Sequence, residues 1–346
     1  MPTISEQLLE AKRIPTHVRQ RRNPMNFLTV DKKLIGDHEA KGWEVERRNK
    51  KSVRMKRAKA HDVAFEDRVW AVAAGLGFRM LNRDRKFRIQ YGPTPSDSRQ
   101  IDVFAADDET VLVVDCKSTE YPRASALKKD IEALQGCERG IRTAIRGEFP
   151  DHKVKFIFAT NGFGLAQPDH ERIESAKFVH LDEDAIEYYE DLLTHLGPAA
   201  RYQFLGMLFA GQKIPGMDSA VTALRAKMGG RTYYSFSIEP ERLLKIAYVL
   251  HRNKANSELM PTYQRLIKRT RLKQVREFVD AGGFFPNSLI INVDAPSRGL
   301  GFDKFAGQSG ADVVAGTLKL PQQFRSAYVI DGQHRLYGYV NSKHGS

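Results

Sequence analysis

Two stretches of the sequence place acidic and basic side chains directly after apolar runs. In IDVFAADDETVLVVDCKST (residues 101–119), the run VLVV leads into Asp115, Cys116 and Lys117, and Asp102 stands on the segment before it. An apolar run of this kind predicts a buried strand, so its charged end is expected to be partly enclosed. Two acids and one base at the end of such a strand are residue types that can act on a phosphodiester.

The spacing of these residues predicts how they meet. If residues 108–109 form the loop of a hairpin, counting outward from the loop places Asp102 directly opposite Asp115. Side chains alternate along a strand, so Asp115 and Lys117 share one face and Cys116 points to the other. Replacing Cys116 is therefore expected to affect packing more than catalysis.

Facing carboxylates repel each other unless something positive lies between them. A hard divalent cation, Mg²⁺ or Mn²⁺, is the simplest remedy, and Lys117 beside it could orient a water or neutralise charge in the transition state. Glu66, on the preceding predicted helix, could complete the metal shell directly or through water. Two plainer interpretations stay open: a surface hairpin with scattered charges, and an ordinary exposed glutamate at position 66.

The second stretch, VIDGQHRLYGY, places Asp331 to Arg335 where a predicted strand turns into a helix. Gly332 permits a tight turn, the helix N-terminus offers free N–H groups, and Arg335 supplies a planar fork. Together these groups would form a phosphate cradle. The alternative is a turn capped by Asp331, with His334 simply solvated.

Regular elements must position both stretches. The spacing of apolar residues predicts a helix that begins at His61 and stops at Gly75 or Gly77. The elements expected after it are β-rich runs at 87–92, 99–107 and 109–117, a helix over 124–147 and an apolar strand over 153–164. The resulting order is helix, three strands, helix, strand. This order is typical of a mixed α/β fold, more narrowly of the α+β class.

The chain of 346 residues is long enough for two domains. We expect a basic N-terminal arm, extended or partly ordered, over residues 1–58 and a first domain over 59–181. A helical connector is expected over 182–230 and a second domain over 231–346. In the second domain, Pro240 is expected at the first position of a helix.

The formal net charge of +13 indicates a polyanionic partner, and DNA is the natural one. The basic excess is concentrated in residues 46–61 and 263–276, although each run could also be a solvated face. No window approaches the ~18 apolar residues of a membrane span, and neither cysteine has metal-ligand spacing. We expect a soluble, cytoplasmic protein without membrane contact, and a homo-oligomer stays open.

The first stretch carries a resemblance to a known superfamily. Asp102, the sequence Asp115-Cys116-Lys117, the flanking helices and the strand FIFATN resemble the PD-(D/E)xK nucleases, in their Mrr-like restriction endonuclease branch. The resemblance covers roughly residues 59–181 and implies an αβββαβ core. The implied roles are metal binding by Asp102, Asp115 and Glu66, catalysis by these acids and Lys117, and a weaker polar contribution from Gln135. Asp115 stands where the Mrr-like branch commonly has glutamate, which the superfamily pattern allows.

The second stretch is similar to another family. DGQHR, with TYQRLIKRTRLKQVREFVDAGGFFPNSLIINV upstream, resembles the DGQHR-domain family that includes DndB of DNA phosphorothioation systems, over roughly residues 200–346. That family is related to the ParB/sulfiredoxin-like fold, in which the corresponding loop binds or hydrolyses nucleotide. The implied nucleotide contacts are Asp331, Gly332, Gln333, His334 and Arg335, with Tyr263, Gln264 and Arg265 lining the same region. Family members continue beyond the motif, so we expect this chain to be truncated and part of the pocket to lie beyond its last residue.

Both resemblances together predict a Mg²⁺-dependent (or Mn²⁺-dependent) DNA endonuclease. The DGQHR module would sense nucleotide or DNA state, in prokaryotic defence or beside a phosphorothioation-like DNA-modification system. Two other functions stay open. One is a DNA-binding regulator or accessory protein, and the other is an NTPase that hydrolyses ATP or another NTP at the DGQHR loop.

Overall fold

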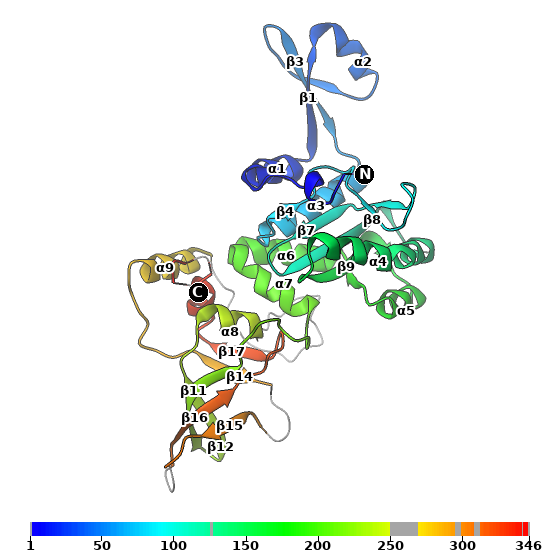
Figure 1. Cartoon of the computed structure of the whole chain (residues 1–346). Coiled ribbons are helices and arrows are strands. Elements are labelled where there is room, and N and C mark those ends of the chain that lie inside the picture. Colours follow the sequence, from blue (N-terminus) through cyan, green and yellow to red (C-terminus); the bar gives the residue numbers. More distant parts are fainter. Residues whose placement is uncertain are drawn as a thin grey trace. The chain divides into compact units, whose positions relative to one another are not determined.

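The computed structural model describes residues 2–124, 127–249, 269–294, 299–307, 312–340 and 342–344. The chain divides into two compact units, Met1–Glu187 and Tyr188–Ser346. Both units combine helices with sheets, so the expected α+β fold class is confirmed (Figure 1).

A five-stranded sheet forms the centre of unit 1. Its strand order is β10-β9-β8-β7-β4. The strands are β4 (Met80–Leu81), β7 (Val103–Ala106), β8 (Thr110–Ala124), β9 (Lys153–Gly164) and β10 (Val179–Leu181). β8 runs antiparallel to β7 and parallel to β9. It therefore lies between the antiparallel part of the sheet (β4 and β7) and the parallel part (β9 and β10).

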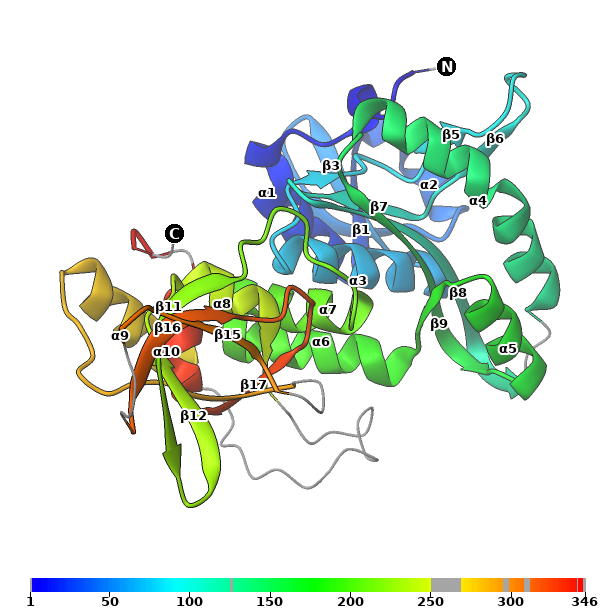
Figure 2. The same cartoon turned by 60° about the horizontal axis from the view of Figure 1, so that its bottom comes forward.

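Helices cover both faces of this sheet. On one face, α4 (Lys128–Glu148) packs Ile131, Leu134 and Ile141 against apolar side chains of β8 and β9. α3 (His61–Gly75) packs against β7 and β8, and Figure 2 shows it on the other side of the sheet from α4. α5 (Gln167–Ser175) follows β9 and leads to β10. The buried strand β8 therefore carries its charged end between two helical layers.

The predicted hairpin and its register are confirmed. Ala106 pairs with Val111 and Val103 with Val114, and the Asp107 N–H donates to the Thr110 carbonyl at 3.0 Å. The Asp107 carboxylate also accepts the backbone N–H groups of Glu109 and Thr110, a turn geometry that aspartate favours. Extending this register by one step places Asp102 opposite Asp115.

Residues 1–58, for which we expected an extended or partly ordered arm, contain regular structure instead. After α1 (Ile14–Arg22), the strands β1 (Met25–Asp31), β2 (Glu44–Arg48) and β3 (Ser52–Ala58) form a sheet of order β1-β3-β2. α2 (Ile35–Glu39) lies between β1 and β2 in sequence. The core is small, with Val30, Val53 and Met55 buried on one face. Alternating charged residues on the other face hid this two-residue period from the sequence analysis.

The first expected β-run does not join the central sheet. β5 (Arg88–Gln90) pairs with β6 (Ser98–Gln100) in a separate two-stranded sheet, and the short strand β4 takes the edge position beside β7. The run at 87–92 is followed by a turn-forming segment, after which the chain reverses and residues 98–100 pair with residues 88–90. This hairpin is complete before the chain reaches Asp102.

Unit 2 contains a four-stranded sheet of order β12-β11-β16-β15 and a three-stranded sheet of order β13-β17-β14. α6 (Glu183–Leu196) carries the chain into this unit, and α7 (Ala200–Leu208) follows. The other elements are β11 (Ala220–Met228), β12 (Arg231–Phe236), α8 (Pro240–Ile246), β13 (Ala247–Tyr248), α9 (Arg269–Asp280), β14 (Ile290–Val293), β15 (Gly301–Lys304), β16 (Val314–Lys319), β17 (Ala327–Asp331) and α10 (Gln333–Gly338).

Two expectations for this part have clear outcomes. Pro240 is the first residue of α8, as predicted. The helical connector expected over 182–230 ends earlier, at Leu208, because residues 220–228 form β11 in the sheet of unit 2. Among the described helices, none combines the length and the apolar character needed to cross a bilayer.

Candidate active site

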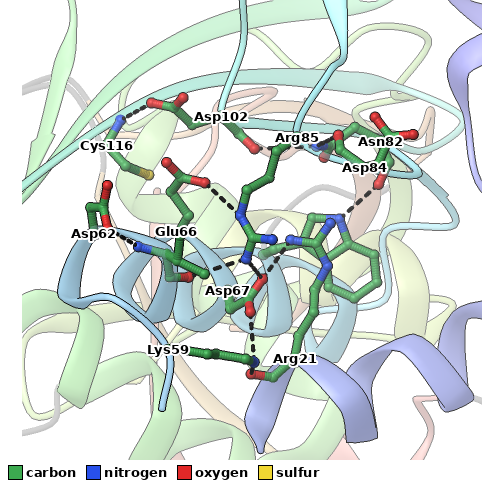
Figure 3. Close-up of polar contacts among 12 residues, drawn as sticks. Arg21, Lys59, Asp62, Glu66, Asp67, Asn82, Asp84, Arg85, Asp102 and Cys116 are labelled. Atoms are coloured by element: carbon green, nitrogen blue, oxygen red, sulfur yellow. Dashed lines mark hydrogen bonds and ion pairs between the residues drawn. The ribbon is translucent and has the colours of Figure 1, made fainter. Parts of the chain in front are cut away.

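The end of the β7–β8 hairpin brings together the acids and the lysine predicted from the sequence. Asp115 is buried, with 6% of its surface exposed, and its two carboxylate oxygens accept hydrogen bonds from Lys117 Nζ and from an arginine, Arg99. Opposite it, Asp102 Oδ2 accepts the backbone N–H of Cys116 at 2.7 Å (Figure 3). The three groups therefore occupy one small region, at the place where the hairpin count put them.

The backbone around Asp102 is fixed by an asparagine that the sequence analysis missed. Asn82 is fully buried, and its side-chain amide donates to the carbonyl of Asp102 at 3.2 Å. Its side-chain oxygen accepts the N–H of Phe104 at 3.1 Å. Because Asn82 holds the chain on both sides of residue 103, the direction of the Asp102 carboxylate is set by buried hydrogen bonds.

Two acidic groups of the site, Asp102 and Glu66, hold their protons unusually strongly. Burial, reinforced by the negative charge of Asp115, raises the pKa of Asp102 to about 6. Burial and the charge of Asp102 raise the pKa of Glu66, on α3, to about 7. Glu66 and Asp102 are thus electrostatically coupled, and both lack enough positive charge nearby to keep an ordinary carboxylate pKa. A carboxylate in this condition is a natural partner for a cation.

Asp115 is better supplied with positive charge. Burial would lower the pKa of Lys117, but the charge and hydrogen bond of Asp115 outweigh it and raise that pKa. The same balance raises the pKa of Arg99. Asp130, on α4, lies 3.7 Å from Lys117 Nζ and holds it from the other side. Lys117 is therefore a fixed, fully charged ammonium beside Asp115.

Glu66 belongs to a buried ionic cluster at the base of α3 (Figure 3). Arg85 Nε donates to Glu66 Oε2 at 3.0 Å, and another nitrogen of the same guanidinium lies 2.5 Å from Asp67. Asp67 also accepts from Arg21 at 2.8 Å and pairs with Lys59 at 2.7 Å. Three cations from distant parts of the chain thus converge on one carboxylate, and one of them also orients Glu66.

The remaining sequence candidate, Gln135, lies on the exposed side of α4. In the part of the chain that the structure describes, it makes no hydrogen bond to the acids or to Lys117. The structure instead adds Arg85 and Arg99 to the site. Neither arginine carried a signal in the sequence, because only the folded chain shows that they lie beside Glu66 and Asp115.

The donor atoms of the site suit a hard divalent cation. Carboxylate oxygens are the ligands that Mg²⁺ and Mn²⁺ prefer, and the raised pKa values of Glu66 and Asp102 show a deficit of positive charge. Within the described ranges, however, no group of three His, Cys, Asp or Glu side chains is arranged to hold a metal ion. Arg85 and Arg99 donate hydrogen bonds to oxygens of Glu66 and Asp115 that a metal ion would need. The site therefore suits a divalent cation in the type and charge of its side chains, but not in their present arrangement.

The DGQHR loop lies in unit 2, at the turn from β17 to α10. Gly332 adopts a positive φ of 92°, and a Cβ there would come within 2.3 Å of Leu289, so the turn requires glycine. Arg335 donates to Asp331 at 2.9 Å and to the Asn287 carbonyl at 2.5 Å. In this arrangement the guanidinium fastens the loop to a neighbouring segment.

The other predicted nucleotide contacts divide into two groups. Gln333 and His334 begin α10, and burial, together with the charge of Arg271, lowers the pKa of His334. His334 is therefore neutral at physiological pH. Tyr263, Gln264 and Arg265 lie outside the described residues. Nucleotide binding at this loop stays a prediction.

The fold and the site define an α+β protein with a buried acid and lysine centre at the end of a strand hairpin. Comparison with known families adds a second element: residues 221–339 match the DndB family, described as DNA-sulfur modification-associated. The C-terminal part is therefore DndB-like, as the DGQHR motif predicted. No curated protein matches the chain.

Among solved structures, the crystal structure of protein VC1899 from Vibrio cholerae resembles this chain at 12% sequence identity with a TM-score of 0.28. The similar region covers 57% of this chain and 54% of that chain, so this chain spans only about half the length of that protein. Such a likeness carries no information about function.

Proposed function

We propose that the chain is a metal-dependent DNA nuclease that works with a DNA-modification system. The observation that supports this proposal most is the pairing of Asp102 with Asp115 across the hairpin, with the Lys117 ammonium held beside them. The raised pKa of Asp102 indicates that its negative charge is unfavourable in the folded protein, and a bound cation would offset that cost. The combination is suited to phosphodiester hydrolysis.

Each residue has a definable part in that reaction. Asp102 and Asp115 would hold Mg²⁺ or Mn²⁺, with Glu66 as a further ligand once it separates from Arg85. When bound, such a cation polarises the phosphate and lowers the pKa of a bound water. Lys117 is fixed by Asp115 and Asp130; it would face the position where negative charge develops and would orient the attacking water. The Cys116 N–H keeps Asp102 aimed at the same place.

DNA is the substrate class that the rest of the chain favours. The net charge of +13 attracts polyanions, and the DndB-like residues 221–339 match a family described by its association with DNA modification. In this proposal the C-terminal part senses whether the DNA is modified, and cleavage depends on that modification state. A nucleotide such as ATP, bound at the DGQHR loop, would be a second signal that controls cleavage.

Cleavage of plasmid DNA in the presence of Mg²⁺ or Mn²⁺ tests the proposal. Asp115→Asn and Lys117→Met should each lower the cleavage rate by at least about 100-fold while DNA binding is retained. Glu132→Gln and Lys128→Met are matched controls, because these α4 side chains are half exposed and pair mainly with each other, 3.8 Å apart. Equal cleavage by all four variants would rule out this centre.

A second candidate is a DNA-binding regulator that uses the same fold without cutting. It is favoured by the DndB match and by the hydrogen bonds that already occupy both oxygens of Asp115. It predicts salt-sensitive DNA binding in wild-type protein and no strand breaks with any divalent cation. The plasmid assay distinguishes the two functions, and release of phosphate from ATP would reveal an NTPase.

A further inference from the structure

The N-terminal sheet, which comprises β1, β3 and β2 with α2 (residues 25–58), is strongly basic. It contains ten lysine and arginine residues but only five aspartate and glutamate residues. Figure 1 shows β1 and β3 extending away from the central sheet of unit 1. A small, charged sheet of this kind has little apolar surface to bury, so its composition points to a role at the surface.

The two acids of β2, Glu44 and Glu46, are paired with cations of the middle strand β3. Glu46 lies 2.8 Å from Arg54, and Glu44 lies 3.7 Å from Lys56. Arg54 also stacks over the ring of Phe27, 4.3 Å from its centroid. The cations of β3 are therefore largely neutralised within the sheet, and the excess positive charge must lie elsewhere.

The excess is most concentrated at the tip of the β2–β3 hairpin. Arg47, Arg48, Lys50 and Lys51 are all exposed, and the turn between the strands is closed by Asn49 N–H donating to the Ser52 carbonyl at 2.8 Å. None of the four cations forms an ion pair with a described acidic residue. Four positive charges within five residues thus stand in solvent on a defined turn.

The base of the sheet is held by buried apolar contacts and by flanking ion pairs. Val53 and Met55 of β3 are fully buried against Val30 of β1. Where the sheet joins the rest of unit 1, Arg21 and Lys59 both bind the buried Asp67. The tip is therefore presented on a regular, hydrogen-bonded hairpin, and such preorganisation lowers the entropic cost of binding.

We propose that this hairpin tip, Arg47 to Lys51, is a binding site for the phosphate backbone of double-stranded DNA. Lysine and arginine side chains that neutralise phosphates release counterions, which gives affinity without reading sequence. The major groove of B-form DNA admits a two-stranded β-ribbon, whereas the major groove of A-form RNA is too narrow for side chains to enter. Duplex DNA is also the partner that the DndB-like part of the chain favours. This DNA-binding proposal is independent of the proposed nuclease activity.

Binding of the full chain to a short DNA duplex, measured in EDTA so that no cleavage occurs, tests the site. One variant removes the tip charges with the substitutions Arg47→Gln, Arg48→Gln, Lys50→Gln and Lys51→Gln. The matched control removes four exposed cations of unit 1 outside this hairpin that form no ion pair with described residues: Lys86→Gln, Arg139→Gln, Arg146→Gln and Lys177→Gln. Both variants have the same net charge, so an effect of total charge is separated from an effect of position.

The tip variant should bind DNA at least about tenfold more weakly than the control near 0.1 M salt, and the slope of log affinity against log salt should fall by about 3 to 4. Because all four tip side chains are exposed, its thermal melt should match that of the wild type. A second variant that exchanges arginine and lysine at these four positions should keep wild-type affinity. Equal DNA binding by the tip variant and the control would overturn the proposal. So would tip-dependent binding of an RNA duplex without tip-dependent binding of DNA.

Discussion

Replacing Asp102 by asparagine should stabilise unit 1 at neutral and alkaline pH. Burial and the charge of Asp115 raise the pKa of Asp102 from 3.8 to about 6, so its charged form is less favourable in the folded protein than in the unfolded chain. Asparagine removes the charge, and its side-chain oxygen can still accept the Cys116 N–H. The variant thus removes the electrostatic cost and keeps the hydrogen bond.

The sign and size of the effect follow from proton linkage. Between pH 4 and 6 the folded state binds more protons than the unfolded state, so the stability of the wild type falls as pH rises through this window. A pKa raised from 3.8 to about 6 corresponds to a cost of about 3 kcal/mol above pH 7 and about half of that at pH 5. For a unit of this size, about 3 kcal/mol corresponds to a rise in melting temperature of about 6–12 °C.

Thermal melts in EDTA at pH 8 and pH 5 measure this difference. Asp102→Asn should melt higher than the wild type at pH 8, with a smaller gain at pH 5. Glu183→Gln is the control, since Glu183 is 47% exposed and lies 3.7 Å from Arg68, and its melting temperature should change by less than about 2 °C. A melting temperature for Asp102→Asn that is lower at pH 8, or a gain that does not vary with pH, would refute the reasoning.

Three further predictions concern the residues around the site. Asp67→Asn should destabilise unit 1 by about 3–5 kcal/mol in a thermal melt, because it leaves Arg21 and Lys59 buried without a counterion; an unchanged melt would contradict the ionic cluster. Arg99→Met should weaken the hold on Asp115 and change the metal concentration needed for half-maximal cleavage, and an identical metal titration would show that Arg99 has no role there. Cys116→Ala should lower the melting temperature but keep cleavage within about threefold, since its backbone N–H is retained; loss of cleavage with normal stability would assign a role to the thiol.

The sequence was most informative where the chain order itself fixes the geometry. The position of Asp102 opposite Asp115 follows from a two-residue loop and the two-residue period of strands, and the structure has that register. The helix carrying Glu66 and the turn at Gly332 were predictable for the same reason, because capping and turn residues act locally. The α+β class followed from the order of these elements.

The sequence was least informative where distant residues meet. Arg85 and Arg99 lie beside Glu66 and Asp115 only because the loops that carry them return to the sheet. Asn82 is likewise an ordinary polar residue until it is buried between two backbone segments. The sheet at residues 25–58 was missed because its basic side chains masked a core of only a few apolar residues.

A crystal structure of the protein with Mn²⁺ tests the central claim most directly. We predict an anomalous peak about 2.0–2.6 Å from a carboxylate oxygen of Asp102 and from one of Asp115, with Glu66 turned away from Arg85 toward the ion. The same soak of Asp115→Asn should lack the peak. A well-ordered wild-type site without bound Mn²⁺, with Asp115 still held by Arg99 and Lys117, would contradict the proposed metal-dependent nuclease.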